Sequence, residues 1–344
     1  MKTLTLWLAL ALCCVYPGVH PVSAFAAQPP MEGFVAVSGI RLQYLDWGGT
    51  GPALILIHGL GDNPHVFDDL APAFTDRFHV IGYARRGSGG SDAVGPYDVT
   101  TLTEDLRGLM QALGITKAIL VGHSAGGDEI TEMAALHPDE VDRIIYLDAA
   151  YDWTDPDFRA GVPVRPLGAF DRPESAMESL DALRAYQKTT WYPDLDDMMR
   201  IEANLRDKVV IQPDGSLRDR TTKEVMEAQY TALSTGKPRQ YNRVSCPALA
   251  IYAEHLYDWH IADNRRREQF VRYENKYWAP FRAKSVDRIR HELPDVEVHI
   301  VPGSHPGFFM TDRSEVVALM RSFLNVPPQG SITLTQSVGA RRGR

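Results

Sequence analysis

The amino-acid sequence predicts an α/β fold, in which helices cover both faces of a doubly wound, mostly parallel sheet and a helical cap is inserted. Short apolar runs rich in Val, Ile and Leu alternate with longer stretches whose apolar residues recur every three to four positions. Gly-rich or polar loops directly follow several of these runs. They would lie at the carboxyl ends of the strands, where the ligand crevice of a parallel sheet is found. The alternation stops near residue 153 and resumes near residue 244, which indicates an insertion.

The predicted strands are apolar runs bounded by turn-forming residues. Phe34–Val37 and Ile40–Leu45 flank Ser38-Gly39, a spacing typical of a β-hairpin. Further strands are expected at Ala53–Ile57, Phe78–Tyr83, Ile119–Val121, Ile144–Leu147, Pro247–Ala253 and Val296–Val301. An amphipathic helix is expected at Thr100–Leu113, and further helices at Val66–Phe74, Asp128–Leu136, Arg265–Glu292 and Ser314–Leu324.

These elements divide the chain into four parts. Residues 27–152 and 244–326 form the predicted core, and residues 153–243 form the cap. Within the cap, helices are expected at Glu174–Gln187, Leu195–Leu205 and Thr222–Leu233, with no clear strand. Residues 327–344 are polar and basic without periodicity, so we expect them to be disordered.

The first 26 residues are typical of a secretory signal peptide. Lys2 supplies a positive charge, and the apolar stretch Thr3–Tyr16 is too short to cross a bilayer. Ala24-Phe25-Ala26 fits the small-x-small cleavage rule, with residues 22–24 as an alternative site and a retained anchor as the competing interpretation. Cleavage would place the protein in the periplasm or outside the cell, without membrane insertion and with Cys246 as its one cysteine.

The charge and spacing of polar residues exclude several classes of partner. The formal net charge of the 344-residue chain is −8, and no basic stripe carries interleaved aromatic residues, so nucleic acid is not expected as a partner. The sequence has no His-x-x-x-His or Cys-x-x-Cys pair and no complete dinucleotide fingerprint after a strand. We therefore expect a small-molecule substrate and no cofactor.

The motif Gly122-His123-Ser124-Ala125-Gly126 lies between a predicted strand and a predicted helix. A sharp turn at this junction exposes the serine hydroxyl, and it needs glycine where a Cβ would collide. Ser124 is therefore the candidate nucleophile. The backbone N–H of Ala125, at the start of the helix, and that of Leu60 are the candidate oxyanion donors.

A serine hydroxyl needs a base to become a good nucleophile. Among 11 histidines, His305 directly follows a predicted strand, in the Pro/Gly loop Pro302–Pro306. A neutral imidazole there would accept the proton of Ser124 and pass it to the leaving group.

Taken together, these motifs make the chain similar to the α/β-hydrolase fold superfamily over residues 34–325. Within it, three stretches resemble a poorly characterised bacterial branch: Arg85-Arg86-Gly87-x-Gly89, Ser124-x-x-Gly127-x-Glu129 and Tyr146-Leu147-Asp148-Ala149-Ala150-Tyr151-Asp152. The resemblance implies a serine hydrolase whose nucleophile, acid and histidine follow one another in the chain. It does not imply a particular substrate. The matching motifs are His58-Gly59, Arg86-Gly87-x-Gly89-x-Ser91, Gly122-His123-Ser124-Ala125-Gly126 and Gly303-Ser304-His305.

The triad acid departs from the pattern that the resemblance implies. Leu256 stands where that pattern has an Asp. Glu254 and Asp258 lie two residues to either side of it, and Asp148 ends the strand after the nucleophile helix, a position that some lipases of the superfamily use. Asp148 is the preferred candidate, with Glu254 and Asp258 as alternatives.

The predicted function is hydrolysis of a carboxylic ester, or a related acyl bond, through an acyl-enzyme. Alternatives on the same fold are a lactonase, an aminopeptidase, a C–C hydrolase, or a non-catalytic protein that binds a small molecule. Aromatic and Met residues of the cap would line a pocket for an apolar acyl or alcohol group. They are Trp153, Phe158, Trp191, Tyr192, Met198 and Met199.

Overall fold

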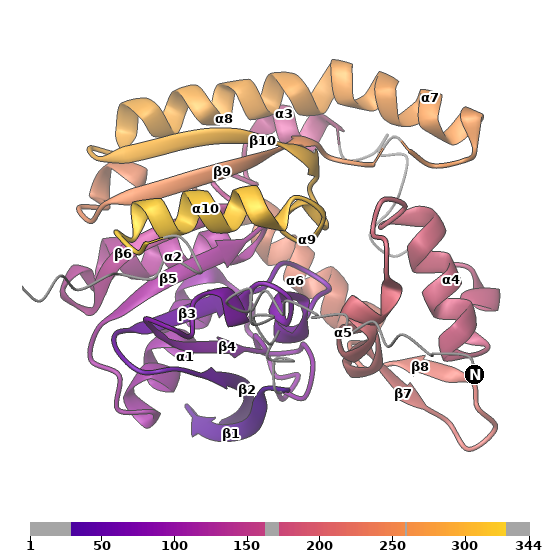
Figure 1. Cartoon of the computed structure of the whole chain (residues 1–344), viewed down its shortest axis with the longest axis horizontal. Coiled ribbons are helices and arrows are strands. Elements are labelled where there is room, and N and C mark those ends of the chain that lie inside the picture. The colour runs from indigo at the N-terminus through magenta and orange to yellow at the C-terminus, as the bar shows by residue number, and fades with distance from the viewer. Residues whose placement is uncertain (1–28, 162–171, 259, 328–344) are drawn as a thin grey trace, which may run out of the picture.

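A computed structural model describes residues 29–161, 172–258 and 260–327 of the chain. Its centre is an eight-stranded sheet in the order β1-β2-β4-β3-β5-β6-β9-β10 (Figure 1). The pairs β1–β2 and β2–β4 are antiparallel and all other neighbours are parallel, which confirms the predicted sheet. The strands are β1 Met31–Val37, β2 Ile40–Gly48, β3 Ala53–Ile57, β4 His79–Tyr83, β5 Ala118–His123, β6 Val141–Leu147, β9 Ala248–His255 and β10 Val296–Ser304.

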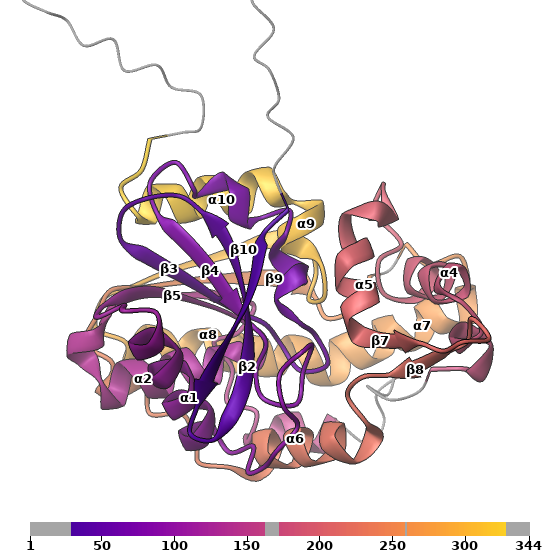
Figure 2. The same cartoon turned by 90° about the horizontal axis from the view of Figure 1, so that it is seen from below.

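Helices cover both faces of this sheet because side chains alternate between the faces along each strand. In β3, Ile55 and Ile57 pack with α1, α2 and α8, whereas Leu54 and Leu56 pack with α9 and α10 on the opposite face (Figure 2). The helices are α1 Val99–Ala112, α2 Gly126–Leu136, α3 Pro156–Gly161, α4 Leu180–Thr190, α5 Glu202–Lys208, α6 Lys223–Thr235, α7 Asn264–Tyr273, α8 Ala279–Glu292, α9 Phe308–Thr311 and α10 Arg313–Phe323.

The helix predicted at Val66–Phe74 is instead a pair of 3₁₀ turns, Pro64–Phe67 and Ala71–Ala73. Pro72 has no N–H and therefore cannot continue a hydrogen-bonded helix from the first turn. The long helix predicted at Arg265–Glu292 is present as α7 and α8, joined by a π-helical turn.

Residues of the predicted cap lie beside the sheet, where α4, α5 and α6 occupy the segments expected to be helical (Figures 1 and 2). The cap also contains a small antiparallel hairpin, β7 Val209–Ile211 and β8 Leu217–Asp219, which the sequence analysis did not expect. Each strand has three residues, too few to show an alternating pattern. The limits of the cap as a domain remain a prediction.

The predicted signal peptide, residues 1–26, lies outside the described residues, as does nearly all of the tail predicted at 327–344. Among the residues that the structure describes, no helix combines the length and the apolar character needed to span a bilayer.

Candidate active site

Ser124 occupies a sharp turn between β5 and α2. Its φ angle is +51°, a left-handed conformation that a non-glycine residue adopts only under constraint. The turn brings the backbone of α2 against β5, and a Cβ at Gly122 would lie 2.6 Å from the Gly126 carbonyl oxygen. The small residues around Ser124 therefore follow from the close approach of two backbone segments.

The structure brings Ser124, His305 and Asp148 together at the carboxyl ends of β5, β10 and β6. His305 Nε2 lies 2.9 Å from Ser124 Oγ, and His305 Nδ1 lies 2.6 Å from Asp148 Oδ2. Asp148 is fully buried, and its N–H donates to the Ile251 carbonyl, 2.7 Å away on β9. With Nδ1–H donating to the carboxylate, Nε2 is left as an acceptor for the Ser124 hydroxyl.

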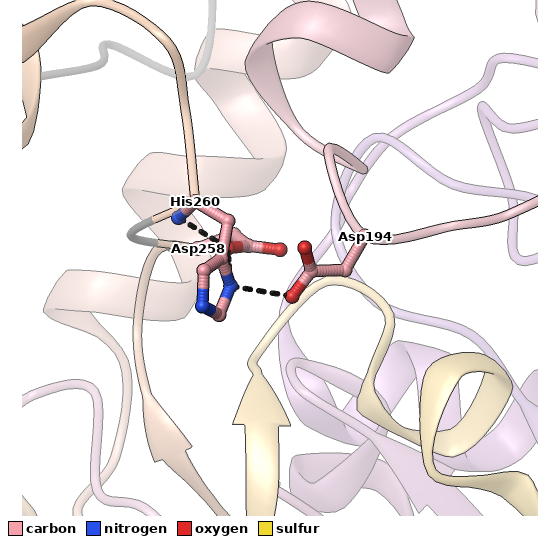
Figure 3. Close-up of side chains that lie close together, drawn as sticks. All are labelled: Asp194, Asp258 and His260. Carbon is pink, nitrogen blue, oxygen red and sulfur yellow. Dashed lines mark hydrogen bonds and ion pairs between the residues drawn. The ribbon is translucent and has the colours of Figure 1, made fainter.

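The other two candidate acids point elsewhere. Glu254 is exposed, and its Oε2 lies 3.8 Å from His255 Nε2. Asp258 Oδ1 accepts from the backbone N–H of His260 and lies 3.1 Å from its Nδ1, which also lies 2.6 Å from Asp194 Oδ2 (Figure 3). Among the described residues, Asp148 is the carboxylate that hydrogen-bonds to His305.

In the described part of the chain, Asp194, Asp258 and His260 form a cluster of side chains that could bind a metal ion. One ligand atom of each lies within 4.8 Å of the others. The Asp194 and His260 side chains are exposed, and both carboxylates already contact the imidazole, so the arrangement is explained as an ion-pair cluster that joins the cap to the loop after β9.

The loop that holds Leu60 is fixed by the buried side chain of His58. His58 Nδ1–H donates to the Gly59 carbonyl at 2.7 Å, and its Nε2 accepts the Arg85 N–H at 3.1 Å. Burial, together with the charge of Arg85, lowers the pKa of His58 to about 3, so the ring is neutral and keeps this tautomer. No backbone hydrogen bond joins the N–H of Leu60 or Ala125 to another described residue, which leaves both donors available.

His123, directly before Ser124, supports the loop of His305. Its Nε2–H donates to the His305 backbone carbonyl at 2.9 Å, and the two imidazole rings lie 5.1 Å apart. Burial, and after it the neighbouring His305, lowers the pKa of His123 to about 4. The His123 ring is therefore neutral near pH 7, and it acts as a brace rather than as a second base.

This lowered pKa predicts a pH dependence of stability. An unfolded His123 takes up a proton as the pH falls below about 6.5, whereas the folded side chain does so only near pH 4, so folding stability is lost across this window. The loss amounts to about 2 kcal/mol at pH 5 relative to pH 7. In His123→Gln the amide can still donate to the His305 carbonyl but does not titrate. Urea denaturation at both pH values should show a loss about 2 kcal/mol smaller in the variant. Equal losses would contradict the assigned pKa.

A cavity of about 530 Å³ opens onto Ser124 and His305, large enough for a small-molecule substrate. Four of the predicted residues line it: Trp153, Phe158, Trp191 and Tyr192. The expectation for Met198 and Met199 is wrong, since neither lines the cavity and Met199 is 60% exposed. Their place is taken by apolar residues that the sequence analysis did not assign to the pocket: Met177, Met226, Leu233 and Leu256.

The cavity wall also contains charged residues that sequence reasoning missed. Lys208 Nζ lies 3.0 Å from Asp62 Oδ1, and Arg172 pairs with Asp219. Burial alone would raise the pKa of Asp62, but Lys208 and a hydrogen bond from Asn204 outweigh it and hold that pKa below its ordinary value. Asp62 and Lys208 are far apart in the chain, and no sequence pattern links them.

Two buried ion pairs hold α2 in place after Ser124. Arg239 pairs with Asp128, and Arg85 pairs with Glu129, with all four side chains almost fully buried. Burial lowers the pKa of Arg239 to about 10, which still leaves it charged near neutral pH. These pairs fix the helix whose first turn carries the Ala125 N–H.

Comparison with known proteins places this chain among the alpha/beta hydrolases. The family described as the alpha/beta hydrolase fold matches residues 52–192. A 2-(acetamidomethylene)succinate hydrolase of Mesorhizobium japonicum is 30% identical over 212 residues, which cover 60% of this chain and 72% of that protein. A putative carbamate hydrolase, RutD, of Caulobacter segnis is 34% identical over 125 residues, 35% of this chain and 46% of that protein. The crystal structure of an E-2-(acetamidomethylene)succinate hydrolase has the same fold, with a TM-score of 0.64 and 24% identity over 86% of this chain and 100% of that one.

Proposed function

Because the chain belongs to the α/β-hydrolase fold family, we propose that it is a serine hydrolase that cleaves a carboxylic ester through an acyl-enzyme, without a cofactor. The observation that carries the proposal is the continuous hydrogen-bonded line from Ser124 Oγ through His305 to the buried carboxylate of Asp148. The Asp148 carboxylate orients the His305 imidazole, and the imidazole can accept the proton of the Ser124 hydroxyl. Activation of a serine hydroxyl requires both.

The proposed reaction has two halves. Ser124 Oγ attacks the ester carbonyl while its proton moves to His305 Nε2, and Asp148 stabilises the resulting imidazolium. The N–H groups of Leu60 and Ala125 donate to the developing oxyanion. His305 then protonates the departing alcohol, and the Ser124 ester remains. Water, deprotonated by His305, attacks this acyl-enzyme, and His305 returns the proton to Ser124 Oγ as the bond to the acyl group breaks and the acid leaves.

The cavity favours a substrate with an apolar group attached to the scissile carbonyl, because Trp153, Phe158 and Trp191 line the same cavity as Ser124. Each further methylene that the wall buries contributes about 0.8 kcal/mol, or roughly fourfold in kcat/KM. For a series of p-nitrophenyl esters, kcat/KM is expected to rise with acyl length to an optimum and then fall.

The variant Trp191→Ala should move this optimum to longer chains by enlarging the cavity. Met199→Ala, which truncates an exposed side chain outside the cavity, is the matched control and should leave the optimum unchanged. A profile that does not depend on chain length would contradict the apolar subsite. The absence of turnover with every ester would favour a non-catalytic binding protein on the same fold.

We also propose that the protein acts outside the cytoplasm, because Lys2 and the apolar stretch up to Tyr16 precede a small-x-small site ending at Ala26. N-terminal sequencing of the protein from its native cells should give a mature chain that starts at Ala27. A chain that starts at Met1 would contradict the proposal.

A further inference from the structure

The geometry points to Tyr151 as a positioning residue, which holds the Asp148 carboxylate in the orientation that His305 needs. This inference rests on the proposed function, because it gives Tyr151 a role in the line of groups that activates Ser124. Tyr151 follows Asp148 by three residues, in the loop after β6, and neither the sequence motifs nor the family resemblance gave it a role.

Each oxygen of the Asp148 carboxylate has its own hydrogen-bond partner. The Tyr151 hydroxyl donates to Asp148 Oδ1 at 2.6 Å, while Oδ2 accepts from His305 Nδ1 at 2.6 Å. Within the described ranges these two groups are the hydrogen-bond partners of the Asp148 side chain. Asp148 is fully buried, so a missing partner at Oδ1 could not be replaced by bulk water, and the carboxylate would be under-solvated.

Aromatic side chains pack around Tyr151 and hold its ring in place. Its ring centroid lies 5.0–5.3 Å from those of Trp153, Tyr252, Trp278 and Phe281, with Phe281 stacked against it. The phenol ring therefore cannot swing away from Asp148. The indole N–H groups of Trp153 and Trp278 are buried without a partner among the described residues, so the cluster offers the acid one donor, the Tyr151 hydroxyl.

Burial and the charge of Asp148 raise the pKa of Tyr151 well above its ordinary value, so its hydroxyl stays protonated as a donor. The other titratable groups nearby are Tyr252 and Arg282, which act on Tyr151, and Glu274, on which Asp148 acts. Burial raises the pKa of Glu274 to about 7, and its Oε2 accepts the Leu256 N–H at 3.0 Å. None of these side chains has a hydrogen bond to the Asp148 carboxylate in the described structure, so none can replace the Tyr151 hydroxyl.

Removing the hydroxyl should make the carboxylate, and with it His305, more basic. In Tyr151→Phe we expect kcat/KM for an ester to fall about tenfold and the acid limb of its pH profile to move upward by about half a pH unit or more. Tyr252→Phe is the matched control, because the Tyr252 hydroxyl is also buried but donates to the Ala150 carbonyl at 3.0 Å. Its acid limb should coincide with that of the wild type. A Tyr151→Phe enzyme whose limb also coincides with the wild type would overturn the inference.

Two further measurements separate this inference from folding defects and from the proposed function. Placing 3-fluorotyrosine at position 151 keeps the ring and strengthens the donor, so the acid limb should move to lower pH; an upward or absent shift would overturn the inference. The downfield proton resonance of His305 Nδ1–H, assigned by its loss in His305→Ala, should shift in Tyr151→Phe but not in Tyr252→Phe. This readout requires no turnover, so it tests the positioning role even if the wild type hydrolyses no ester.

Discussion

Replacing Ser124 by alanine is expected to lower kcat for ester hydrolysis on the order of 10⁵-fold, because the attacking oxygen is removed. The residual rate would come from binding and from the oxyanion donors, which the substitution leaves in place. Ser124→Ala removes one oxygen from a side chain held by its backbone turn, so the thermal unfolding temperature should stay close to that of the wild type. Steady-state kinetics on the best ester of the chain-length series measures the effect.

Ser216→Ala is the matched control for this substitution. Ser216 lies in the exposed turn between β7 and β8, and its hydroxyl donates to Asp214 at 2.6 Å. This variant should hydrolyse the ester at the wild-type rate. If Ser124→Ala retained activity within tenfold of the wild type, the reaction would not depend on this hydroxyl. That result would contradict the proposed acyl-enzyme mechanism.

Replacing Asp148 by asparagine is expected to lower kcat by about 10³- to 10⁴-fold. The amide is neutral and cannot stabilise the imidazolium of His305, and its NH₂ group favours the tautomer in which Nε2 carries the proton and cannot accept that of Ser124. The folded state should persist, because the amide keeps the size of the carboxylate. Kinetics and thermal unfolding of the same preparation separate these two effects.

The alternative acids supply the control for this experiment. Glu254→Gln and Asp258→Asn should each stay within about twofold of the wild type, since Glu254 is exposed and Asp258 bonds to His260. A large loss in either variant, with near-full activity in Asp148→Asn, would move the acid to the loop after β9. It would then contradict the hydrogen bond between His305 and Asp148.

The sheet was predictable because its strands depend on local composition. The run Ala53–Ile57 is apolar at every position, and the structure buries all five residues between two helical layers. The site at the carboxyl ends of the strands followed from the same reasoning. Elements that depend on few residues were less predictable, such as the three-residue strands β7 and β8, and the turns around Pro72.

The candidate acid illustrates what the sequence leaves open. Asp148 lies 157 positions before His305, and it reaches the imidazole because its backbone continues the pairing of β6 with β9, through the bond to Ile251. That placement depends on the register of parallel strands, which no local pattern encodes. The same holds for Tyr151, whose ring is held by three aromatic rings from distant segments, and for the pair of Asp62 with Lys208.

The most direct measurement is reaction of the folded protein with a fluorophosphonate probe, followed by mass spectrometry of the peptides. If the Ser124 hydroxyl is activated by His305, the adduct will form on Ser124 in the wild type and will be strongly reduced in His305→Ala. A wild-type protein that stays unlabelled at Ser124 while folded, or one that is labelled equally well without the imidazole, would contradict the account.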